Sequence, residues 1–145
     1  MYGRALVQAF SFFSARVQTK LEYLWQDFFS DIVDLDFEPA VVHDDLYPAH
    51  ILCRPDRPDL AGIIDFGDVR VRDRAGDFAG LLAEFGRPFT ETVLHEYGHE
   101  AGASFWQRVN FYCKVAPFHD ILFEFGNGHD EFAKYGMEDL WRRLV

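Results

Sequence analysis

The residues most able to do chemistry lie in two short acidic loops, at positions 43–46 and 64–68. The first, the HDDL loop, follows two valines that predict a strand, and His50 comes five residues after its Asp45. The second, the IDFGD loop, ends an apolar run and carries Asp65. Phosphoryl transfer needs one carboxylate facing the substrate hydroxyl, and a second carboxylate with a nearby donor atom to hold a metal. A single Asp would be explained by turn capping, but the two loops in this order predict a phosphotransferase site.

Each side chain in these loops can be given a physical role. Asp45 would accept the hydroxyl proton, which requires hydrogen-bond reach. Asp65 would offer a hard oxygen ligand to magnesium. His43 is expected to brace the HDDL loop by hydrogen bonding to backbone or to Asp65. Gly67 is expected to let the chain turn away without a Cβ clash.

Residues 41–77 resemble the catalytic and metal loops of the aminoglycoside phosphotransferase family, which is related to protein kinases. That family carries His-Gly-Asp-Leu-x-x-x-x-Asn, then Ile-Asp-Phe/Trp-Gly-Asp, then Gly-Asp-Pro-x-x-Asp. This chain departs from the pattern with Asp44 for Gly, His50 for Asn and Arg74 for Pro. The run of His, Ile and Leu from His50 resembles the branch that acts on the 2″-hydroxyl of aminoglycosides. The residues that match are His43, Asp45, Leu46, Ile64, Asp65, Phe66, Gly67, Asp68, Asp73 and Asp77.

The resemblance implies transfer of the γ-phosphoryl group of ATP or GTP to a hydroxyl of an aminoglycoside or similar small cationic molecule. It assigns the catalytic loop to His43 and Asp45, and magnesium to Asp65, with His50 as the second ligand. An imidazole is a softer ligand than an amide oxygen, so His50 is the weaker assignment of the two.

The acceptor's ammonium groups would need acids, and its sugar rings could stack on an aromatic side chain. Trp106 or Tyr112 could provide the stacking. Glu84 is the first choice among the acids because it follows the IDFGD loop most closely. Each of these residues taken alone is more often a surface charge or a core aromatic than a binding residue. The candidate acids are Asp68, Glu84, Asp120 and Glu124.

Composition sets broad limits on function. The chain has 145 residues, of which 49% are hydrophobic and 17% aromatic, and this predicts one ordered domain over 1–145. A net charge of −10 argues against nucleic-acid and anionic-membrane binding and favours cationic partners, although acidity also serves solubility. The only cysteines, Cys53 and Cys113, form no paired pattern, which indicates reduced thiols in a cytoplasmic protein. Neither a signal peptide nor a transmembrane run is evident.

The expected fold is α+β and mostly helical, like a kinase-like C-terminal lobe. Apolar spacing predicts one well-covered helix over residues 4–30. Short strands at 51–54 and 61–64, joined by turn residues, predict an antiparallel ribbon that places Asp45, His50 and Asp65 around one cleft. The remainder is predicted helical, with a break at 86–88, a Thr90 cap and a new helix from Pro117. Asp77 is expected to cap a helix and brace the metal loop.

The charged run from 69 to 75 leaves two explanations open. Arg70, Arg72 and Arg74 could contact phosphate, or they could be solvated charges and partners for the nearby acids.

Parts of a complete kinase-like enzyme are missing from these 145 residues. No G-x-G-x-x-G is present, and Lys20, Lys114 and Lys134 do not lie in a V-A-I-K-like strand. The chain is therefore expected to be a substrate-binding lobe without the nucleotide lobe, with weak or no turnover by itself. The alternative is a non-catalytic lobe that binds a cationic ligand or self-associates through the face that the nucleotide lobe would cover.

A second motif points to different chemistry. Residues 95–99 read HEYGH and match H-E-x-x-H, which on one helix would bind zinc through His95 and His99 with Glu96 as general base. Gly98 weakens that helix, and no further ligand motif follows. The competing explanation is a helix end with exposed histidines.

Overall fold

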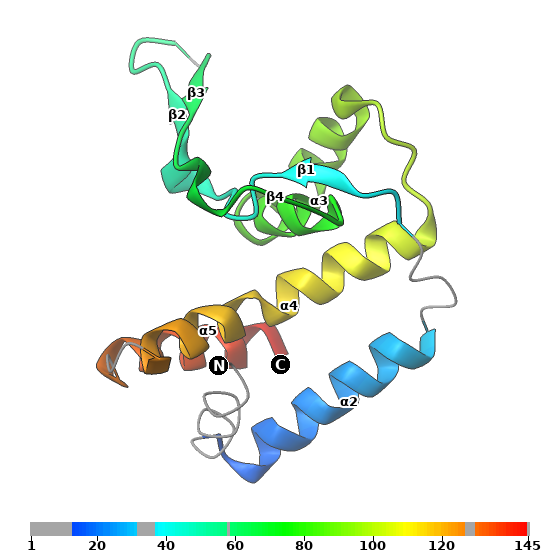
Figure 1. Cartoon of the computed structure of the whole chain (residues 1–145), viewed down its shortest axis with the longest axis vertical. Helices are drawn as coiled ribbons and strands as arrows, with labels where there is room; N and C mark the ends of the chain where they lie inside the picture. Colours follow the sequence, from blue (N-terminus) through cyan, green and yellow to red (C-terminus); the bar gives the residue numbers. More distant parts are fainter. Residues whose placement is uncertain (1–12, 32–36, 58, 127–129, 145) are drawn as a thin grey trace. The chain divides into compact units, whose positions relative to one another are not determined.

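The computed structural model describes residues 13–31, 37–57, 59–126 and 130–144 (Figure 1). It divides into unit 1, comprising Met1–Ile32 and Lys114–Val145, and unit 2, comprising Val33–Cys113. The expected α+β, mostly helical class is confirmed. In the described part of the chain, no helix has the length and apolar character needed to span a membrane.

Unit 2 carries both acidic loops on short strands and 3-10 turns. The HDDL loop follows β1, and the IDFGD loop follows β3. The elements in chain order are β1 (Ala40–Val42), η1 (Pro48–His50), β2 (Ile51–Cys53), β3 (Leu60–Ile63), η2 (Phe66–Asp68), β4 (Arg70–Arg72), α3 (Ala75–Tyr97) and the first part of α4 (Ala103–Gly126).

Two antiparallel ribbons hold the loops. The predicted ribbon is present as β2–β3, with Ile51 opposite Ile63, and it extends from the rest of unit 2 (Figure 1). The β1–β4 ribbon was not predicted, because the alternating Arg-Val-Arg of β4 resembles a solvated charge run. In it Val41 lies opposite Val71, and both side chains are exposed. The β1–β4 ribbon brings the segment after the IDFGD loop back beside the strand that leads into the HDDL loop.

The core of unit 2 lies between α3 and the start of α4. Its buried side chains include Phe78, Leu94, Phe105 and Val109. The predicted break appears as a kink at Gly86, whose φ of 76° and ψ of 175° are accessible to glycine. Thr90 is not a cap: its hydroxyl donates to the carbonyl of Gly86 from inside the second segment of α3.

Unit 1 consists of α2 (Ala15–Asp31), the rest of α4 and α5 (Asp130–Leu144). The predicted helix is confirmed from Ala15 onward; Phe13 and Ser14 are not helical, and residues 4–12 lie outside the described part. The expectation that this helix is well covered is wrong for Trp25 and Phe29, which are exposed at its C-terminal end. Its buried core is formed by Phe13, Leu21, Ile121 and Leu140.

The prediction of a new helix from Pro117 is wrong, because α4 runs through this residue. A proline inside a helix removes one backbone donor and crowds the preceding turn, but it does not force a break where packing holds the turns together. Both Pro117 and the following Ile121 are buried, and Ile121 belongs to the core of unit 1.

A glycine on α3 controls how closely the HDDL loop approaches the helix. A Cβ added at Gly80 would lie 2.3 Å from the carbonyl oxygen of Leu46, inside van der Waals contact. This is a backbone atom, so a side chain at position 80 could be accommodated only if the loop moved. Sequence reasoning missed Gly80 because a lone helix glycine carries no signal of what packs against it.

We therefore expect Gly80→Ala to destabilise the chain by about 2 kcal/mol, although alanine favours helix, because overpacking must displace the loop. Equilibrium urea unfolding measures the change. The control is Gly62→Ala, where an added Cβ meets nothing within 4 Å. Equal stability of the two variants would contradict the close approach.

Candidate active site

His50 lies between the two carboxylates that the sequence singled out. Its Nδ1 is 3.5 Å from Asp45 Oδ2, and its Nε2 is 3.5 Å from Asp65 Oδ2. The imidazole is buried, whereas the side chains of Asp45 and Asp65 are 44% and 62% exposed. The ribbon therefore brings these three residues together as expected, with the carboxylates accessible from solvent.

One hydrogen bond fixes the tautomer of neutral His50. Its Nδ1 lies 2.8 Å from the backbone carbonyl of Asp45. A carbonyl only accepts, so Nδ1 must carry the proton. The neutral ring then presents a lone pair from Nε2 toward the Asp65 carboxylate, which is also electron-rich. The two acceptors repel each other unless a cation lies between them.

This donor pair fits a magnesium ion that also binds phosphate. Among the described residues, no group of three or more His, Cys, Asp or Glu side chains forms a metal site. Magnesium in phosphotransferases is usually held by one or two protein ligands, with substrate phosphates and water completing its octahedral shell. The Asp65 carboxylate and His50 Nε2 are the residues that would hold it.

His43 braces the two loops against each other. Its Nε2 donates to the backbone carbonyl of Ile64 at 2.9 Å, which fulfils the backbone alternative of the sequence prediction. Its ring also packs 4.8 Å from that of Phe66. His43 is buried, so we assign it to loop position and not to contact with substrate.

Asp77 holds the backbone of the HDDL loop. Its two carboxylate oxygens accept the backbone N–H groups of His43, at 2.9 Å, and of Asp44, at 2.8 Å. The expectation that Asp77 caps a helix and braces the metal loop is corrected. It lies inside the first turn of α3, and the helix-start N–H of Ala75 is instead bonded by Asp73.

Left-handed backbone occurs at Asp44, with φ of 64°, and at Asp65, with φ of 65°. Asp tolerates this region better than most residues. The left-handed residue that turns the chain in the IDFGD loop is therefore Asp65. The role expected for Gly67 is corrected, because a Cβ at position 67 would make an ordinary 3.5 Å contact with Asp65 Oδ1.

Arginines neutralise the other acids around the loops. Arg70 and Arg72 lie 2.7 and 2.5 Å from the carboxylate of Asp44, and Arg74 lies 3.1 Å from Glu38. The predicted alternative that these arginines partner nearby acids therefore describes the geometry. Asp68 is exposed and lies 3.5 Å from Arg70.

A buried ion pair ties α4 to the segment before α3. Arg108 Nε lies 2.6 Å from Asp73 Oδ2, and both side chains are almost fully buried. Tyr112 lies beside this pair, and burial together with the charge of Asp73 raises the pKa of its hydroxyl. Sequence reasoning missed the pair because Arg108 carries no local signal within its helix.

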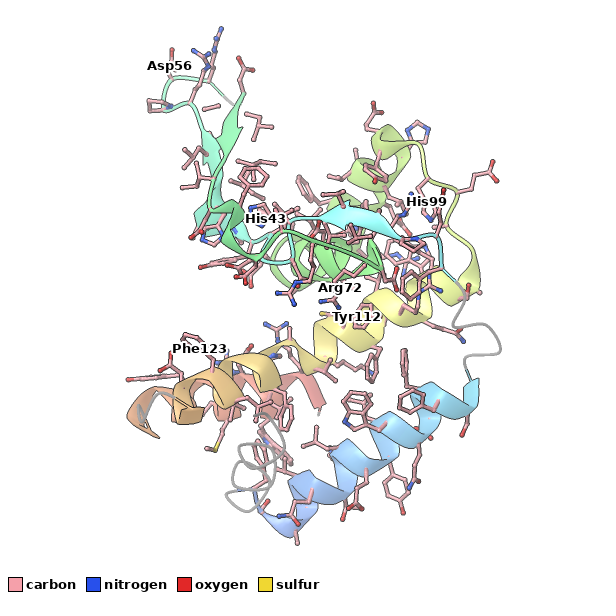
Figure 2. The ribbon with its side chains drawn as sticks, in the orientation of Figure 1. His43, Asp56, Arg72, His99, Tyr112 and Phe123 are labelled. Atoms are coloured by element: carbon pink, nitrogen blue, oxygen red, sulfur yellow. The ribbon has the colours of Figure 1, made fainter. Side chains whose placement is uncertain are left out.

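The predicted acceptor residues are distributed over both units. Glu84 is exposed on α3, in the same unit as Asp45. Asp120 and Glu124 lie on α4 in unit 1, so their assignment stays a prediction. A guanidinium lies over each aromatic candidate. Arg87 lies 3.4 Å over the ring of Trp106. Arg72 lies 5.4 Å over the ring of Tyr112 (Figure 2).

The H-E-x-x-H segment does not form one helical face. α3 ends at Tyr97, and Gly98 adopts a left-handed φ of 74°. His95 is exposed on the last turn, whereas His99 follows the helix, where Arg74 Nη1 donates to its Nδ1 at 3.4 Å. The pair thus lacks the i, i+4 geometry that zinc peptidases use, and the helix-end explanation describes these residues.

Comparisons with known proteins place the chain beside phosphotransferases. A model of the phosphotransferase enzyme family matches residues 4–112. The chain is 31% identical over 93 residues to the uncharacterized protein YcbJ of Bacillus subtilis (strain 168), covering 64% of this chain and 30% of YcbJ.

Solved structures show the same fold. The GDP complex of wild-type aminoglycoside 2'-phosphotransferase-IIIa is 24% identical, with a TM-score of 0.84 covering 99% of this chain and 49% of that chain. Macrolide 2'-phosphotransferase type I is 22% identical, with a TM-score of 0.72 covering 96% and 46%. The expected kinase-like C-terminal lobe is confirmed, and the chain spans about half the length of these solved relatives.

We expect Asp77→Ala to destabilise the chain by about 3 kcal/mol, because two backbone N–H groups lose a charged acceptor. Urea unfolding measures the loss. The control is Asp59→Ala, which removes an exposed carboxylate that lies 2.7 Å from Arg57. A loss for Asp77→Ala no larger than for the control would contradict the bracing role.

Burial and the neighbouring Arg74 guanidinium hold the pKa of His99 below its ordinary value of 6.5. As pH falls through 6.5, unfolded His99 takes a proton before folded His99 does, so stability decreases toward acid pH. We expect His99→Gln to flatten the dependence of unfolding free energy on pH between about pH 5 and 7. His95→Gln, which changes an exposed histidine, is the control, and an unchanged slope in His99→Gln would refute the expectation.

Proposed function

Because the chain belongs to the phosphotransferase enzyme family, we propose that it provides the base and metal ligands for phosphoryl transfer to a hydroxyl of an aminoglycoside-like molecule. The observation that carries this proposal is the position of His50, 3.5 Å from both Asp45 and Asp65. The buried imidazole fixes the HDDL loop through the Asp45 carbonyl and also separates the two accessible carboxylates. The arrangement does suit a base and a metal ligand that must act side by side.

The proposed step moves one phosphoryl group. The acceptor hydroxyl attacks the γ-phosphorus of ATP or GTP, a new P–O bond forms, and the bond to the β-phosphate oxygen breaks. The hydroxyl proton passes to Asp45, and the nucleoside diphosphate leaves. His50 Nδ1–H donates to the Asp45 carbonyl, so it holds the main chain of the base in place while its carboxylate stays free to receive the proton.

Asp65 and His50 Nε2 would hold Mg²⁺, which supplies charge neutralisation on the phosphates when it is bound. The left-handed backbone of Asp65 turns its carboxylate toward His50 and away from the apolar strand before it. The protein's part in such catalysis is chiefly to position these groups before the reaction.

A cationic acceptor fits the charge of the chain. Its net charge is −10, and an acceptor carrying ammonium groups would be attracted before any specific contact forms. Asp68 and Glu84 are the acids of unit 2 that we assign to those groups, with Asp120 and Glu124 as further candidates. A solved relative named for aminoglycosides and one named for macrolides make both classes reasonable acceptors to test.

A non-catalytic binding role is the second candidate. The apolar pair Val41 and Val71 and the side chain of Phe66 are exposed beside the acidic loops. Such a surface suits association with another protein surface, including a second copy.

The test is a mass-spectrometric transfer assay with the purified chain, magnesium, ATP or GTP, and panels of aminoglycosides and macrolides. We expect slow addition of one phosphoryl group to an aminoglycoside, abolished in Asp45→Asn and in Asp65→Asn. Turnover near the roughly 1–100 s⁻¹ of kinases would contradict the expectation of slow transfer by this chain.

The matched control is Asp59→Asn at the tip of the β2–β3 ribbon, which removes a carboxylate outside the site. Transfer that persists in Asp45→Asn would refute the assigned base. A folded chain that transfers nothing to any acceptor would favour the binding role, which light scattering would then test as self-association.

A further inference from the structure

The residue before the proposed base is itself an unusual one. Asp44 has a positive φ of 64°, its side chain is only 8% exposed, and two arginines contact its carboxylate. We propose that Asp44, Arg70 and Arg72 form a clamp that fixes the HDDL loop to the IDFGD loop and so positions Asp45 relative to Asp65. The effect of this clamp on catalysis rests on the proposed function. The link that it makes between the two loops does not depend on that function.

The backbone alone does not explain an aspartate at this position. Glycine adopts positive φ at no steric cost, whereas aspartate tolerates it with some strain. Burying a carboxylate carries a desolvation penalty, which only a paired cation or hydrogen-bond donors can offset. The acid at position 44 is therefore compatible with stability only because of the arginines that meet it.

Strand alternation delivers both arginines to the same carboxylate. Side chains at positions 70 and 72 of β4 lie on one face of the ribbon, and Val71 lies on the other face, where it is 68% exposed. Arg70 Nε lies 2.7 Å from Asp44 Oδ2, and Arg72 Nη1 lies 2.5 Å from Asp44 Oδ1. Each oxygen of Asp44 thus has its own guanidinium.

Arg70 also reaches the second loop. The same Nε that faces Asp44 donates to the backbone carbonyl of Asp68 at 3.1 Å, and Arg70 Nη2 lies 3.5 Å from the Asp68 carboxylate. Asp68 is the last residue of the IDFGD loop. One guanidinium therefore joins the residue next to the proposed base with the loop that carries the proposed metal ligand.

Arg72 anchors the clamp to the core. Its guanidinium lies 5.4 Å over the ring of Tyr112 on α4, and Figure 2 shows the two side chains facing each other. A Cβ at Gly76 would lie 3.6 Å from Asp44 Oδ1 and 3.7 Å from the guanidinium carbon of Arg72, so the start of α3 covers this ion pair. Arg70, which is half-exposed, is the part of the clamp open to solvent.

The assigned roles differ between neighbours. Asp45 would contact the acceptor hydroxyl, whereas Asp44 and Arg70 are positioning residues that act through the loops. Loss of the clamp should therefore lower kcat more than it raises KM for the nucleotide, because transfer depends steeply on the separation of base and metal ligand.

Hydrogen–deuterium exchange of the full chain tests the clamp without requiring activity. Asp44→Asn keeps a residue that tolerates positive φ and removes the charge, and Arg70→Gln removes the bridging cation. We expect either substitution to raise amide exchange by about threefold or more in both loops, including the one that carries no substitution. Adding Arg70→Gln to Asp44→Asn should change exchange little further.

Arg57→Gln, which breaks an exposed ion pair at the ribbon tip, is the matched control and should leave both loops unchanged. The clamp would be overturned if amide exchange rose only in the loop that carries the substitution. It would also be overturned if the exchange effects of Asp44→Asn and Arg70→Gln multiplied in the double variant.

A kinetic arm separates positioning from stability wherever transfer is detected. Arg70→Lys keeps a cation within reach of Asp44, so it should recover most of the kcat lost in Arg70→Gln, whereas equal kcat in the Lys and Gln variants would overturn the role of the charge. Where this chain transfers nothing by itself, the exchange result alone decides whether the clamp exists.

Discussion

The site depends on one carboxylate that accepts two consecutive backbone N–H groups. Asp77, in the first turn of α3, bonds the N–H groups of His43 and Asp44 together. Consecutive N–H groups converge on one anion only where the chain turns sharply, and the positive φ of Asp44 supplies that turn. The direction in which Asp45 leaves the loop follows from this, as does the close approach of the Leu46 carbonyl to Gly80. A rigid helix therefore sets the position of a loop that has little regular structure.

The acids of unit 2 all carry the same charge, but they fall into a buried group paired with arginines and an accessible group. Asp44 and Asp73 are nearly buried, and arginines from β4 and α4 neutralise them. Asp45 and Asp65 remain accessible, and their shared neighbour is the imidazole of His50. Burying an unpaired charge is costly, so the paired acids serve the architecture and the accessible acids are available for chemistry.

Much of this site could be predicted from the sequence because its parts are local. The HDDL loop, His50 and the IDFGD loop are joined by one short ribbon, and the strand pattern of that ribbon is readable. The contributions of Asp77, Gly80 and Arg108 could not be predicted in the same way, since each depends on a partner more than 30 residues away in the chain. The β1–β4 ribbon was missed because alternating arginines are typical of solvent-exposed segments, and here their common partner is a buried acid that follows the opposite strand. The uninterrupted α4 shows the same limit, because packing around Pro117 overrides a local helix-breaking signal.

The base of the β2–β3 ribbon sets the distance between His50 and Asp65, and the turn at its far end does not. His50 enters it and Ile64 leaves it, and the N–H of Ile64 donates to the carbonyl of His50 at 3.0 Å. The separation of His50 and Asp65 is therefore set by strand register at the base of the ribbon, where a slip of one residue would shift the pairing by about 3.3 Å and reverse which side chains face inward. The turn at the far end does not enter this relation. The length and composition of that turn therefore place no constraint on the spacing of His50 and Asp65.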